Sequence, residues 1–415
     1  MAAPYLISAL DIGGEKIKLS LAEFEGPEKA LKFIDYFQEP SFGIRRGVVV
    51  DIEEVAKKIL SLKEKAEKSL KIEIEEVFIN IDGSHLFMVP SRGTVAVSRA
   101  DHYISEEDVE RAIEAAEVIS LPFNKEIIKT IPQKFIVDTE KNIKNPLGMK
   151  GTRLEVEILA IGCFSPYYNN LKEAIGRADL DIVEISPSVL ASAESVLSQR
   201  QKEFGVALLD IGSWTTGLAV FEEGSLIHLA IFPFGSGNIT NDIAIGFQTE
   251  LEVAEFIKLK YGTLNLSSKK GQDKIEVLPK EILKEAGFEA DEKKKIVFSK
   301  KTLNHIIEAR ISEMFDEIQK ELKKIGRLKM LPAGIVLTGG GSKIPDLDSF
   351  AAKNFKLPAK LGYPKGFENC PRDLALATSC GLLLIGKKKI LEETKSSKNH
   401  PLNWFKKIFR IFESS

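Results

Sequence analysis

One short pattern occurs twice in the chain, about half its length apart. The sequence ALDIG at residues 9–13 recurs as LLDIG at residues 208–212. Each copy follows an apolar run that predicts a buried strand, and each leads into a second predicted strand, at residues 17–22 and 218–221. A strand–turn–strand unit used twice predicts two related α/β domains that face each other.

The two turns carry residues that suit phosphate and metal binding. Glycine lets backbone N–H groups turn outward toward phosphate oxygens, and an aspartate at each strand end can hold Mg²⁺, directly or through water. The candidate residues are Asp11, Gly13, Gly14, Glu15 and Lys16 in the first turn, and Asp210, Gly212, Ser213, Trp214, Thr215 and Thr216 in the second. Asp11 and Asp210 are the metal candidates. A single such turn is usually an ordinary hairpin, but two copies and a third glycine motif favour a nucleotide site.

The third motif is the sequence GIVLTGGGS at residues 334–342. A predicted buried strand ends in three glycines, which allow the backbone to lie flat against a planar base or a ribose. Such a turn is common and weak on its own, and it gains weight because it follows the two Asp-Ile-Gly turns in order. The adenosine candidates here are Gly339, Gly340, Gly341 and Ser342.

Two further elements follow the second turn. In the sequence FGSGNITND at residues 234–242 a helix is predicted to open at Ile239, and free N–H groups around Gly235, Gly237 and Asn238 would suit a phosphate. Glu255 and Lys258 lie three residues apart on one predicted helical face. They could contact the ribose and the base edge, or they could form an ordinary exposed ion pair.

The pattern changes between residues 83 and 162. A strand at 94–97, a helix capped by Ser105 and Asp108, and strands at 134–137 and 154–162 are predicted there. This strand–helix–strand–strand unit lies between two longer α/β stretches, which predicts a small inserted subdomain.

The end of the chain has the pattern of a helix that lies in a membrane surface. After a helix expected at about residues 374–388, a polar tether at 392–401 leads to the sequence NWFKKIFRIF. From Phe405 onward apolar residues fall at i, i+3, i+4 and i+7, and basic residues take the other side, as in interfacial helices on anionic lipid. The membrane candidates are Trp404, Phe405, Lys406, Lys407, Ile408, Phe409, Arg410, Ile411 and Phe412. The alternative, a helix docked on the protein's own core, fits the polar tether less well.

Composition and cysteine spacing argue against several classes of protein. With 58 Lys and Arg against 60 Asp and Glu, the net charge of -2 argues against a general nucleic-acid binder. Cys163, Cys370 and Cys380 form no CxxC pair, so a disulfide scaffold or zinc ribbon is not expected and a reducing, cytoplasmic compartment is. The N-terminus lacks the basic region of a signal peptide. No stretch reaches the roughly 18 apolar residues of a spanning helix.

The motifs, in this order, resemble those of the actin/Hsp70/sugar-kinase superfamily. The inserted segment narrows the resemblance. GTVAVS at 93–98 with ISEEDV at 104–109, KNPLGMKGTRLEV at 144–156, and the stretch 235–258 are similar to the FtsA family of actin-like bacterial division proteins. The resemblance covers nearly the whole chain.

This resemblance implies an α/β, actin-like ATPase fold of two duplicated domains, with the inserted subdomain 1C and a C-terminal amphipathic helix. It implies the following division: subdomain 1A at 1–82, 164–202 and 362–390; subdomain 1C at 83–163; subdomain 2A at 203–232 and 301–361; subdomain 2B at 233–300; a flexible linker at 391–402; and the membrane-targeting helix at 403–415. ATP or ADP with Mg²⁺ would sit in the cleft between the 1A and 2A halves.

The resemblance also implies a function and partners. The protein would be a peripheral scaffold on the cytoplasmic face of the inner membrane at the division site. It would polymerise with itself, bind anionic lipids, anchor filaments of the division tubulin FtsZ through the FtsZ C-terminal tail on subdomain 2B, and recruit other divisome proteins. No nucleic-acid partner is expected.

The second turn departs from the family pattern. Relatives usually read DIGGGTTD, whereas this chain reads DIGSWTTG, with Trp214 in place of a glycine and Gly217 in place of an aspartate. Before the helix predicted at 189–197, only Glu184 is an acidic neighbour that could orient an attacking water. Phosphoryl transfer needs an oriented nucleophile. Nucleotide binding with at most weak ATPase activity is therefore expected, and no catalytic residue is identified.

Three alternative functions are considered, of which a pilus-assembly scaffold is the strongest. A scaffold of type IV pilus assembly similar to PilM has a related insert, but PilM relatives lack the terminal amphipathic helix. A metabolic kinase of the superfamily needs a catalytic aspartate in a sugar cleft, and the sequence gives no such signal. An Hsp70-type chaperone needs a large β domain after the ATPase, for which the chain is too short.

Overall fold

The computed structural model describes residues 5–264, 274–280, 282 and 295–396. The first α/β domain contains β1 (Tyr5–Ile12), β2 (Lys16–Phe24), β3 (Leu31–Pro40), β4 (Ile44–Arg45), β5 (Val48–Val49), α1 (Ile52–Leu70), β6 (Glu76–Ile81), α3 (Ser165–Gly176), β11 (Asp181–Pro187), α4 (Ser188–Val196), β19 (Phe367–Glu368), a 3₁₀ helix η2 (Leu374–Leu376) and α11 (Ala377–Ser396). The insert contains β7 (Phe87–Ala96), α2 (Glu106–Glu117), β8 (Lys125–Val137), β9 (Glu140–Ile143) and β10 (Arg153–Phe164).

The remaining elements belong to the second half of the molecule. They are α5 (Gln199–Phe204), β12 (Val206–Ile211), β13 (Thr216–Glu222), β14 (Ser225–Phe232), α6 (Ser236–Phe247), α7 (Leu251–Tyr261), β15 (Lys274–Val277), β16 (Ile296–Ser299), α9 (Lys300–Lys324), β17 (Ile335–Thr338), the 3₁₀ helix η1 (Gly340–Lys343), α10 (Leu347–Phe355) and β18 (Ala359–Leu361).

The two main sheets have the same arrangement around the two Asp-Ile-Gly turns. The first sheet has the order β11-β6-β1-β2-β3-β19 and the second β14-β13-β12-β17-β18. β1 is antiparallel to β2 and parallel to β6, and β12 is antiparallel to β13 and parallel to β17. The central strands read as apolar runs because both faces of each sheet are covered. The prediction of two related α/β domains is confirmed.

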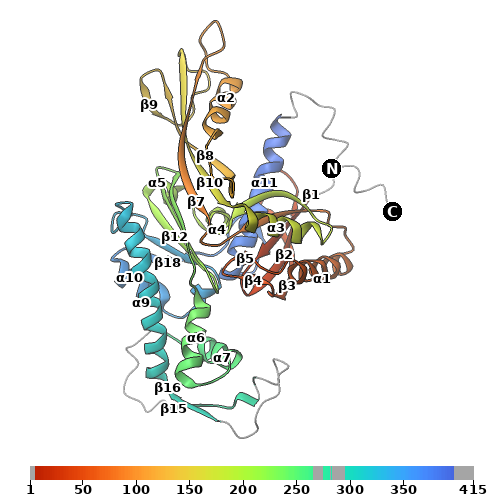
Figure 1. Ribbon diagram of the computed structural model, residues 1–415, viewed down its shortest axis with the longest axis vertical. Coiled ribbons are helices and arrows are strands. Elements are labelled where there is room, and N and C mark those ends of the chain that lie inside the picture. Colours follow the sequence, from red (N-terminus) through yellow and green to blue (C-terminus); the bar gives the residue numbers. More distant parts are fainter. Residues whose placement is uncertain (1–4, 265–273, 281, 283–294, 397–415) are drawn as a thin grey trace.

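The insert is a separate layer at one end of the molecule, as Figure 1 shows at the top of the view. Its sheet has the order β7-β10-β8-β9, and α2 packs on β7 and β10 over a small core of its own. The predicted cap is present: Ser105 and Asp108 form a reciprocal capping box at the start of α2. The strands predicted at 94–97 and 134–137 are too short, because β7 and β8 pair with β10 along almost their whole length. The short strand β9 was not predicted.

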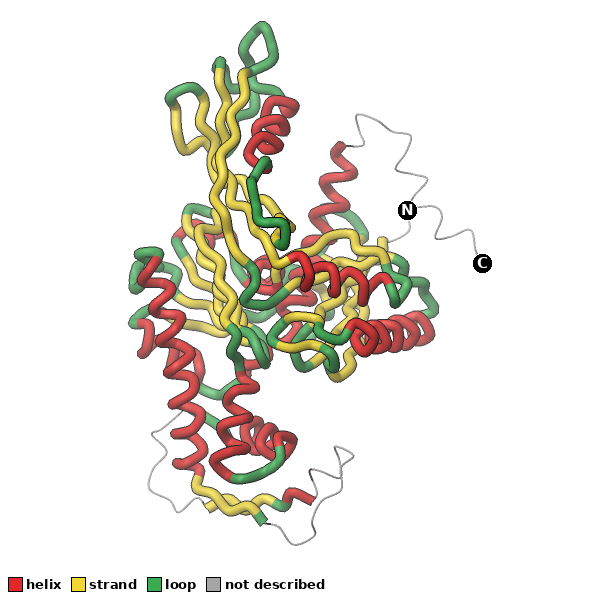
Figure 2. The backbone as a smooth tube through the Cα atoms, viewed as in Figure 1, coloured by secondary structure: helices red, strands yellow, loops and turns green. Residues whose placement is uncertain are grey.

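The elements α6, α7, β15 and β16 lie at the other end of the long axis, beside α9 (Figure 2). Their buried side chains belong to the same apolar core as the second sheet; Ile243, Ile257 and Phe298 pack in one cluster with Leu209 and Leu337. The long helix α9 joins them, since its face with Leu303, Ile307, Met314, Ile318 and Leu322 is buried in this cluster.

Helices α4 and α11 lie against each other between the two sheets. α11 packs on β1, β2 and β6, whereas α4 packs on β12 and β13. The two helices cross so closely that a Cβ on Gly381 would lie 1.7 Å from the carbonyl oxygen of Ala191. This helix pair joins the two halves beneath the Asp-Ile-Gly turns.

The last described helix is longer than its sequence predicts. α11 continues to Ser396, past the expected end at residue 388 and into the stretch 391–396 that was expected to be linker. Ile385 and Ile390 are buried, and the Thr394 hydroxyl donates to the carbonyl of Ile390 at 2.7 Å. Lysine, leucine and glutamate in this stretch are good helix formers, and the apolar contacts extend the helix beyond the point where its charged residues suggested an end.

The predicted membrane helix at residues 403–412 lies outside the described residues. Within the described part of the chain, no helix combines the length and the apolar character needed to cross a bilayer.

Candidate functional site

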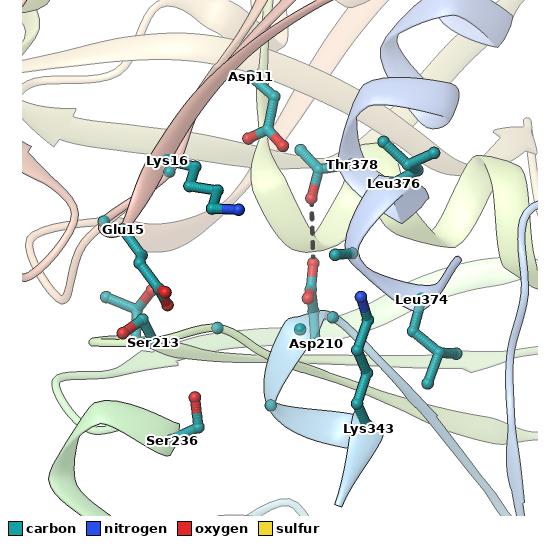
Figure 3. A pocket seen from close by; sticks show the side chains of 18 of the residues that line it. Asp11, Glu15, Lys16, Asp210, Ser213, Ser236, Lys343, Leu374, Leu376 and Thr378 are labelled. Atoms are coloured by element: carbon teal, nitrogen blue, oxygen red, sulfur yellow. Dashed lines mark hydrogen bonds between the residues drawn. The ribbon is translucent and has the colours of Figure 1, made fainter. Parts of the chain in front are cut away.

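Both Asp-Ile-Gly turns open onto one cavity of about 350 Å³ between the two domains. Figure 3 shows Asp11, Glu15 and Lys16 on one side of it and Asp210 and Ser213 facing them. The predicted residues that line the cavity are Asp11, Gly13, Gly14, Glu15, Lys16, Asp210, Gly212, Ser213, Thr215, Glu255, Lys258, Gly339, Gly340 and Gly341. Three motifs far apart in the sequence therefore meet in one place.

The turn glycines are required by close packing inside the turns, not by the left-handed backbone or outward-facing N–H groups that a phosphate loop would need. None of Gly13, Gly14 and Gly212 has a left-handed backbone. A Cβ on Gly13 would lie 2.7 Å from the Lys16 carbonyl oxygen. The Gly13 N–H donates to that oxygen at 3.2 Å, and the Gly212 N–H donates to the Thr215 carbonyl at 2.9 Å. These two amides close their own hairpins, so the expectation that they would point outward to phosphate is wrong for them.

The first aspartate is held by a buried lysine that the sequence interpretation missed. Lys18 Nζ lies 2.8 Å from Asp11 Oδ2, and Ser379 donates its hydroxyl to the same oxygen at 3.2 Å. Burial alone would lower the pKa of Lys18, but the Asp11 carboxylate raises it above its ordinary value. Lys18 lines the cavity. It follows Lys16 by two residues in β2 and so shares its face, which is the signal that would have found it.

The second aspartate is held by hydroxyl groups from both helices of the central pair. Asp210 Oδ2 accepts from Ser192 in α4 and, at 3.3 Å, from Thr378 in α11, the bond drawn in Figure 3. Burial raises the pKa of Asp210 to about 6, and the neighbouring carboxylates of Asp82 and Asp11 act in the same direction.

A third carboxylate, Asp82, faces this cavity from the end of β6. Its Oδ2 accepts from the Thr215 hydroxyl at 2.6 Å and its Oδ1 from the Gly83 N–H at 2.8 Å. The first of these bonds links the two domains across the cleft. Burial raises the pKa of Asp82 to about 6 despite both hydrogen bonds. No spacing in the sequence marks this residue, because its partner lies in the other domain.

The raised pKa of Asp82 makes a testable contribution to stability. The folded protein binds a proton at this carboxyl more tightly than the unfolded chain, so ionisation costs stability as the pH rises from about 4 to about 6. Asp82→Asn cannot ionise and so escapes this loss. We therefore expect the unfolding free energy of the variant minus that of wild type to be about 1–2 kcal/mol larger at pH 7.5 than at pH 4.5. Urea denaturation of both proteins at the two pH values measures this difference. A difference that is independent of pH would contradict the assignment.

The glycine run at 339–341 forms the opposite wall. Gly339 has φ 84°, and a Cβ there would lie 2.4 Å from Asp210 Oδ1, so both backbone and space require glycine. Gly340 has an ordinary backbone and faces open space, because a Cβ at this position would have Ala375 Cβ, 3.8 Å away, as its nearest neighbour. Ser342 does not line the cavity; it is buried, and its hydroxyl donates to the Thr338 carbonyl at 2.6 Å.

Glu255 and Lys258 form an ion pair in which the lysine is buried and the glutamate is partly exposed. Lys258 Nζ lies 2.6 Å from Glu255 Oε2, and the lysine side chain is only 4% exposed. The same ammonium donates to the Thr240 hydroxyl at 2.8 Å and to the Ser236 carbonyl at 3.2 Å. Both charged residues line the cavity.

The N-terminus of α6 has a different role from the predicted phosphate site. The helix begins at Ser236 rather than Ile239. The N–H groups of Ser236 and Gly237 donate to the carbonyls of Gly212 and Ser213 at 2.9 and 2.7 Å. These amides brace the second turn, so they do not serve a phosphate. Gly235 and Asn238 are likewise joined to each other, by a 2.9 Å bond from the Gly235 N–H to the Asn238 side chain.

Two predicted residues of the second turn, Trp214 and Thr216, do not line the cavity. The Trp214 ring lies against Gly14 and Gly237, where it fills the space between the first turn and α6. Thr216 is fully buried, and its hydroxyl donates to the Phe234 carbonyl at 2.8 Å. Neither is among the residues that line the cavity.

The other lining residues were not among the predicted site residues. They are Tyr36, Gln38, Asn80, Ser188, Val189, Gly217, Ser236, Leu259, Lys343, Ile344, Pro345, Asp373, Leu374, Ala375, Leu376 and Thr378, together with Lys18 and Asp82. Lys343 and Asp373 form an ion pair at 2.7 Å that joins η1 to the segment before α11. Glu184, the acidic candidate for orienting water, instead pairs with Lys129 at 2.6 Å and is not part of the lining.

Solved structures share this fold at low sequence identity. The PilM-PilN type IV pilus biogenesis complex matches with a TM-score of 0.63 and 17% identity, over 92% of this chain and 98% of that one. MreB 5 of Spiroplasma citri bound to AMPPNP matches with a TM-score of 0.55 and 14% identity, over 96% and 99%. The predicted actin-like fold is confirmed, and at these identities the likeness is one of fold alone.

Sequence comparisons are more specific. Residues 207–381 match the family model of cell division protein FtsA, and residues 83–161 match that of the SHS2 domain inserted in FtsA. Cell division protein FtsA of Pseudomonas aeruginosa is 32% identical over 92% of this chain and 90% of its own length. The protein of the same name from Neisseria meningitidis is 34% identical over 91% and 89%, and that from Bacillus subtilis is 34% identical over 83% and 76%. This actin-like chain, with its inserted domain, therefore belongs to the FtsA family of bacterial cell division proteins.

Proposed function

We propose that the cavity binds ATP or ADP. The phosphates of the nucleotide would lie between the two Asp-Ile-Gly turns, beside Lys18. The base would lie against the glycine run and the Glu255–Lys258 pair. The observation that carries this proposal is the meeting of the two turns and the glycine run around one cavity of about 350 Å³. Two solved structures of MreB 5 that share the fold are bound to AMPPNP and to ADP. A calorimetric titration with ATP and Mg²⁺ tests the proposal: we expect saturable binding, and no measurable affinity for any adenine nucleotide would overturn it.

The residues fit a Mg²⁺ ion that is held mainly by the nucleotide. In the part of the chain that the structure describes, no group of three or more ligating side chains could hold a metal, and Asp11 Oδ2 is already occupied by Lys18 and Ser379. Mg²⁺ usually keeps several waters and takes one or two carboxylates plus phosphates. Asp11 and Asp210 would therefore orient its water shell. The bound ion would neutralise phosphate charge.

Hydrolysis of the bound nucleotide is expected to be slow. Glu184 is tied to Lys129 and lies off the cavity wall, and Trp214 fills space at the second turn. A steady-state phosphate-release assay with lipid present measures the rate. Turnover at the roughly 1–100 per second of ordinary kinases would contradict this expectation.

We further propose that the protein is a membrane-tethered scaffold at the division site. In this proposal it polymerises with itself, recruits other divisome proteins, and lies on the cytoplasmic face of the inner membrane through residues 403–415 and anionic lipids. The division into subdomains 1A, 1C, 2A and 2B given above belongs to the same proposal, with the linker starting beyond Ser396. Family membership and the actin-like fold support it. The likeness to PilM concerns fold alone, so a pilus role has no comparable support.

The FtsZ C-terminal tail is expected to dock on the segment 233–300. The lysines of this segment could pair with acidic residues of the tail, although several of them lie outside the described residues. Among the described residues of the segment, Ile245 and Val297 are strongly exposed, at 76% and 57%. We expect Ile245→Glu with Val297→Glu to weaken binding of a tail peptide tenfold or more, as about 1.4 kcal/mol or more is lost. Phe123→Glu, at a fully exposed apolar position in the insert, is the control. Tail binding that survives replacement of the whole segment would refute the placement.

A further inference from the structure

Two thiols meet beside the nucleotide cavity. The Sγ atoms of Cys370 and Cys380 lie 3.5 Å apart. Cys380 is fully buried in the first turns of α11, among Ile7, Ala9 and Leu376, whereas Cys370 is partly exposed on the chain that leads into η2. The lack of a CxxC pair predicted no disulfide scaffold, and the proximity of these two thiols results from the fold.

The segment between the two cysteines forms one wall of the cavity. Asp373, Leu374, Ala375 and Leu376 all line it. Asp373 pairs with Lys343 of η1, and the Leu374 carbonyl accepts from the Gly339 N–H at 3.2 Å. A constraint on the ends of this segment therefore acts directly on the glycine run.

We infer that Cys370 and Cys380 are an oxidant-responsive pair whose reversible disulfide holds this wall of the cavity in place. A disulfide has an S–S length near 2.05 Å, so the two sulfurs need to approach by about 1.5 Å from their present separation. The partly exposed end of the segment, at Cys370, is the end that can move, since Cys380 is fixed in the packed helix pair.

The chemistry balances with hydrogen peroxide as the oxidant. The Cys370 thiolate attacks the O–O bond and becomes a sulfenic acid, and the hydroxide that leaves takes up a proton to give water. The Cys380 sulfur then attacks Cys370 Sγ, the S–O bond breaks, and a second water leaves with the Cys380 proton. Two thiols lose two electrons in total and one peroxide gains them. A dithiol reductant reverses the reaction by thiol–disulfide exchange.

The environments of the thiols assign these roles. The contact with the Cys380 thiol lowers the pKa of Cys370 and favours the Cys370 thiolate as the attacking group. The same contact and burial raise the pKa of Cys380. Cys163 is an internal control, because burial raises its pKa to about 12 and it lies in another core cluster.

The bond itself is tested by mass spectrometry of the folded, full-length protein treated with peroxide. We expect the loss of two hydrogens and a tryptic link between the Cys370 and Cys380 peptides, both reversed by dithiothreitol. Cys163→Ser should behave as wild type, and Cys370→Ser should give no link. Peroxide that yields only sulfinic or sulfonic acid at Cys370, or leaves the thiols unlinked, would overturn the inference.

The effect on the cavity rests on the proposed nucleotide binding and has a separate readout. We expect a fluorescent adenine nucleotide to leave the oxidised protein at least twofold more slowly than the reduced protein, with no such change in Cys370→Ser. Linked cysteines with an unchanged release rate would overturn the coupling to the cavity. If neither form binds the nucleotide, the proposed function fails, whereas the mass measurement still decides whether the pair reacts.

Discussion

Replacing Gly340 with leucine is expected to lower the affinity for ATP roughly a hundredfold or more, a loss of about 3 kcal/mol. Gly340 lines the cavity, its backbone is not left-handed, and a Cβ there would have only Ala375 within 4 Å. A leucine side chain is therefore directed into space that we assign to the base. It occupies that space without forcing the surrounding structure to move.

The measurement is a calorimetric titration with ATP and Mg²⁺, accompanied by a thermal unfolding curve. Gly176→Leu is the matched control, because Gly176 ends α3, has an ordinary backbone and has nothing within 4 Å of the point that a Cβ would occupy. We expect Gly176→Leu to bind as wild type and Gly340→Leu to keep its unfolding temperature. Unchanged affinity in a folded Gly340→Leu protein would show that the base lies elsewhere.

Deleting residues 403–415 is expected to release the protein from anionic liposomes and to leave nucleotide binding unchanged. The apolar stripe that starts at Phe405 contains four large side chains, each worth roughly 1.5–3 kcal/mol when fully buried, which gives a gross gain of order 10 kcal/mol. Partial burial and the cost of ordering a short helix reduce this gain sharply. Lys406, Lys407 and Arg410 add about 1 kcal/mol each near anionic lipid.

One copy should therefore bind reversibly, and a polymer should hold to the surface by avidity. Phe409→Glu, which places a charge in the middle of the stripe, should mimic the deletion, whereas Ser414→Glu adds the same charge beyond it and serves as control. High salt should weaken the wild-type interaction because headgroup attraction is screened. Cosedimentation with liposomes measures all four cases. A truncated protein that cosediments as well as the full chain would show that this helix is not the anchor.

The elements that could be predicted from the sequence are those with strong local signals. The apolar runs on either side of both turns are strands that pair with each other, as predicted, and the Ser105 cap starts α2 as expected. β12 and β17 are parallel neighbours, so Asp210 and the glycine run that follow them meet at one edge of the second sheet. The position of Asp11 across a cleft from them was implied by the resemblance to actin-like ATPases and not by the local pattern.

The details that were missed depend on contacts between distant segments. Asp82 gains its role from Thr215 in the other domain, and the N–H groups at the start of α6 are used by carbonyls of the second turn. The end of α11 is set by its apolar packing beyond residue 388, which a rise in charged residues concealed. Local pattern identifies which turns matter, whereas the hydrogen-bond partners inside them follow from the packing of the two halves.

A crystal structure of the protein with Mg²⁺ and a non-hydrolysable ATP analogue would show directly whether the cleft between the two domains holds the nucleotide. We expect the phosphates between the turns that carry Asp11 and Asp210, with Lys18 beside them, and the adenine against Gly340 and the Glu255–Lys258 pair. An analogue bound outside this cleft, or a cleft that stays empty at saturating analogue, would contradict this placement.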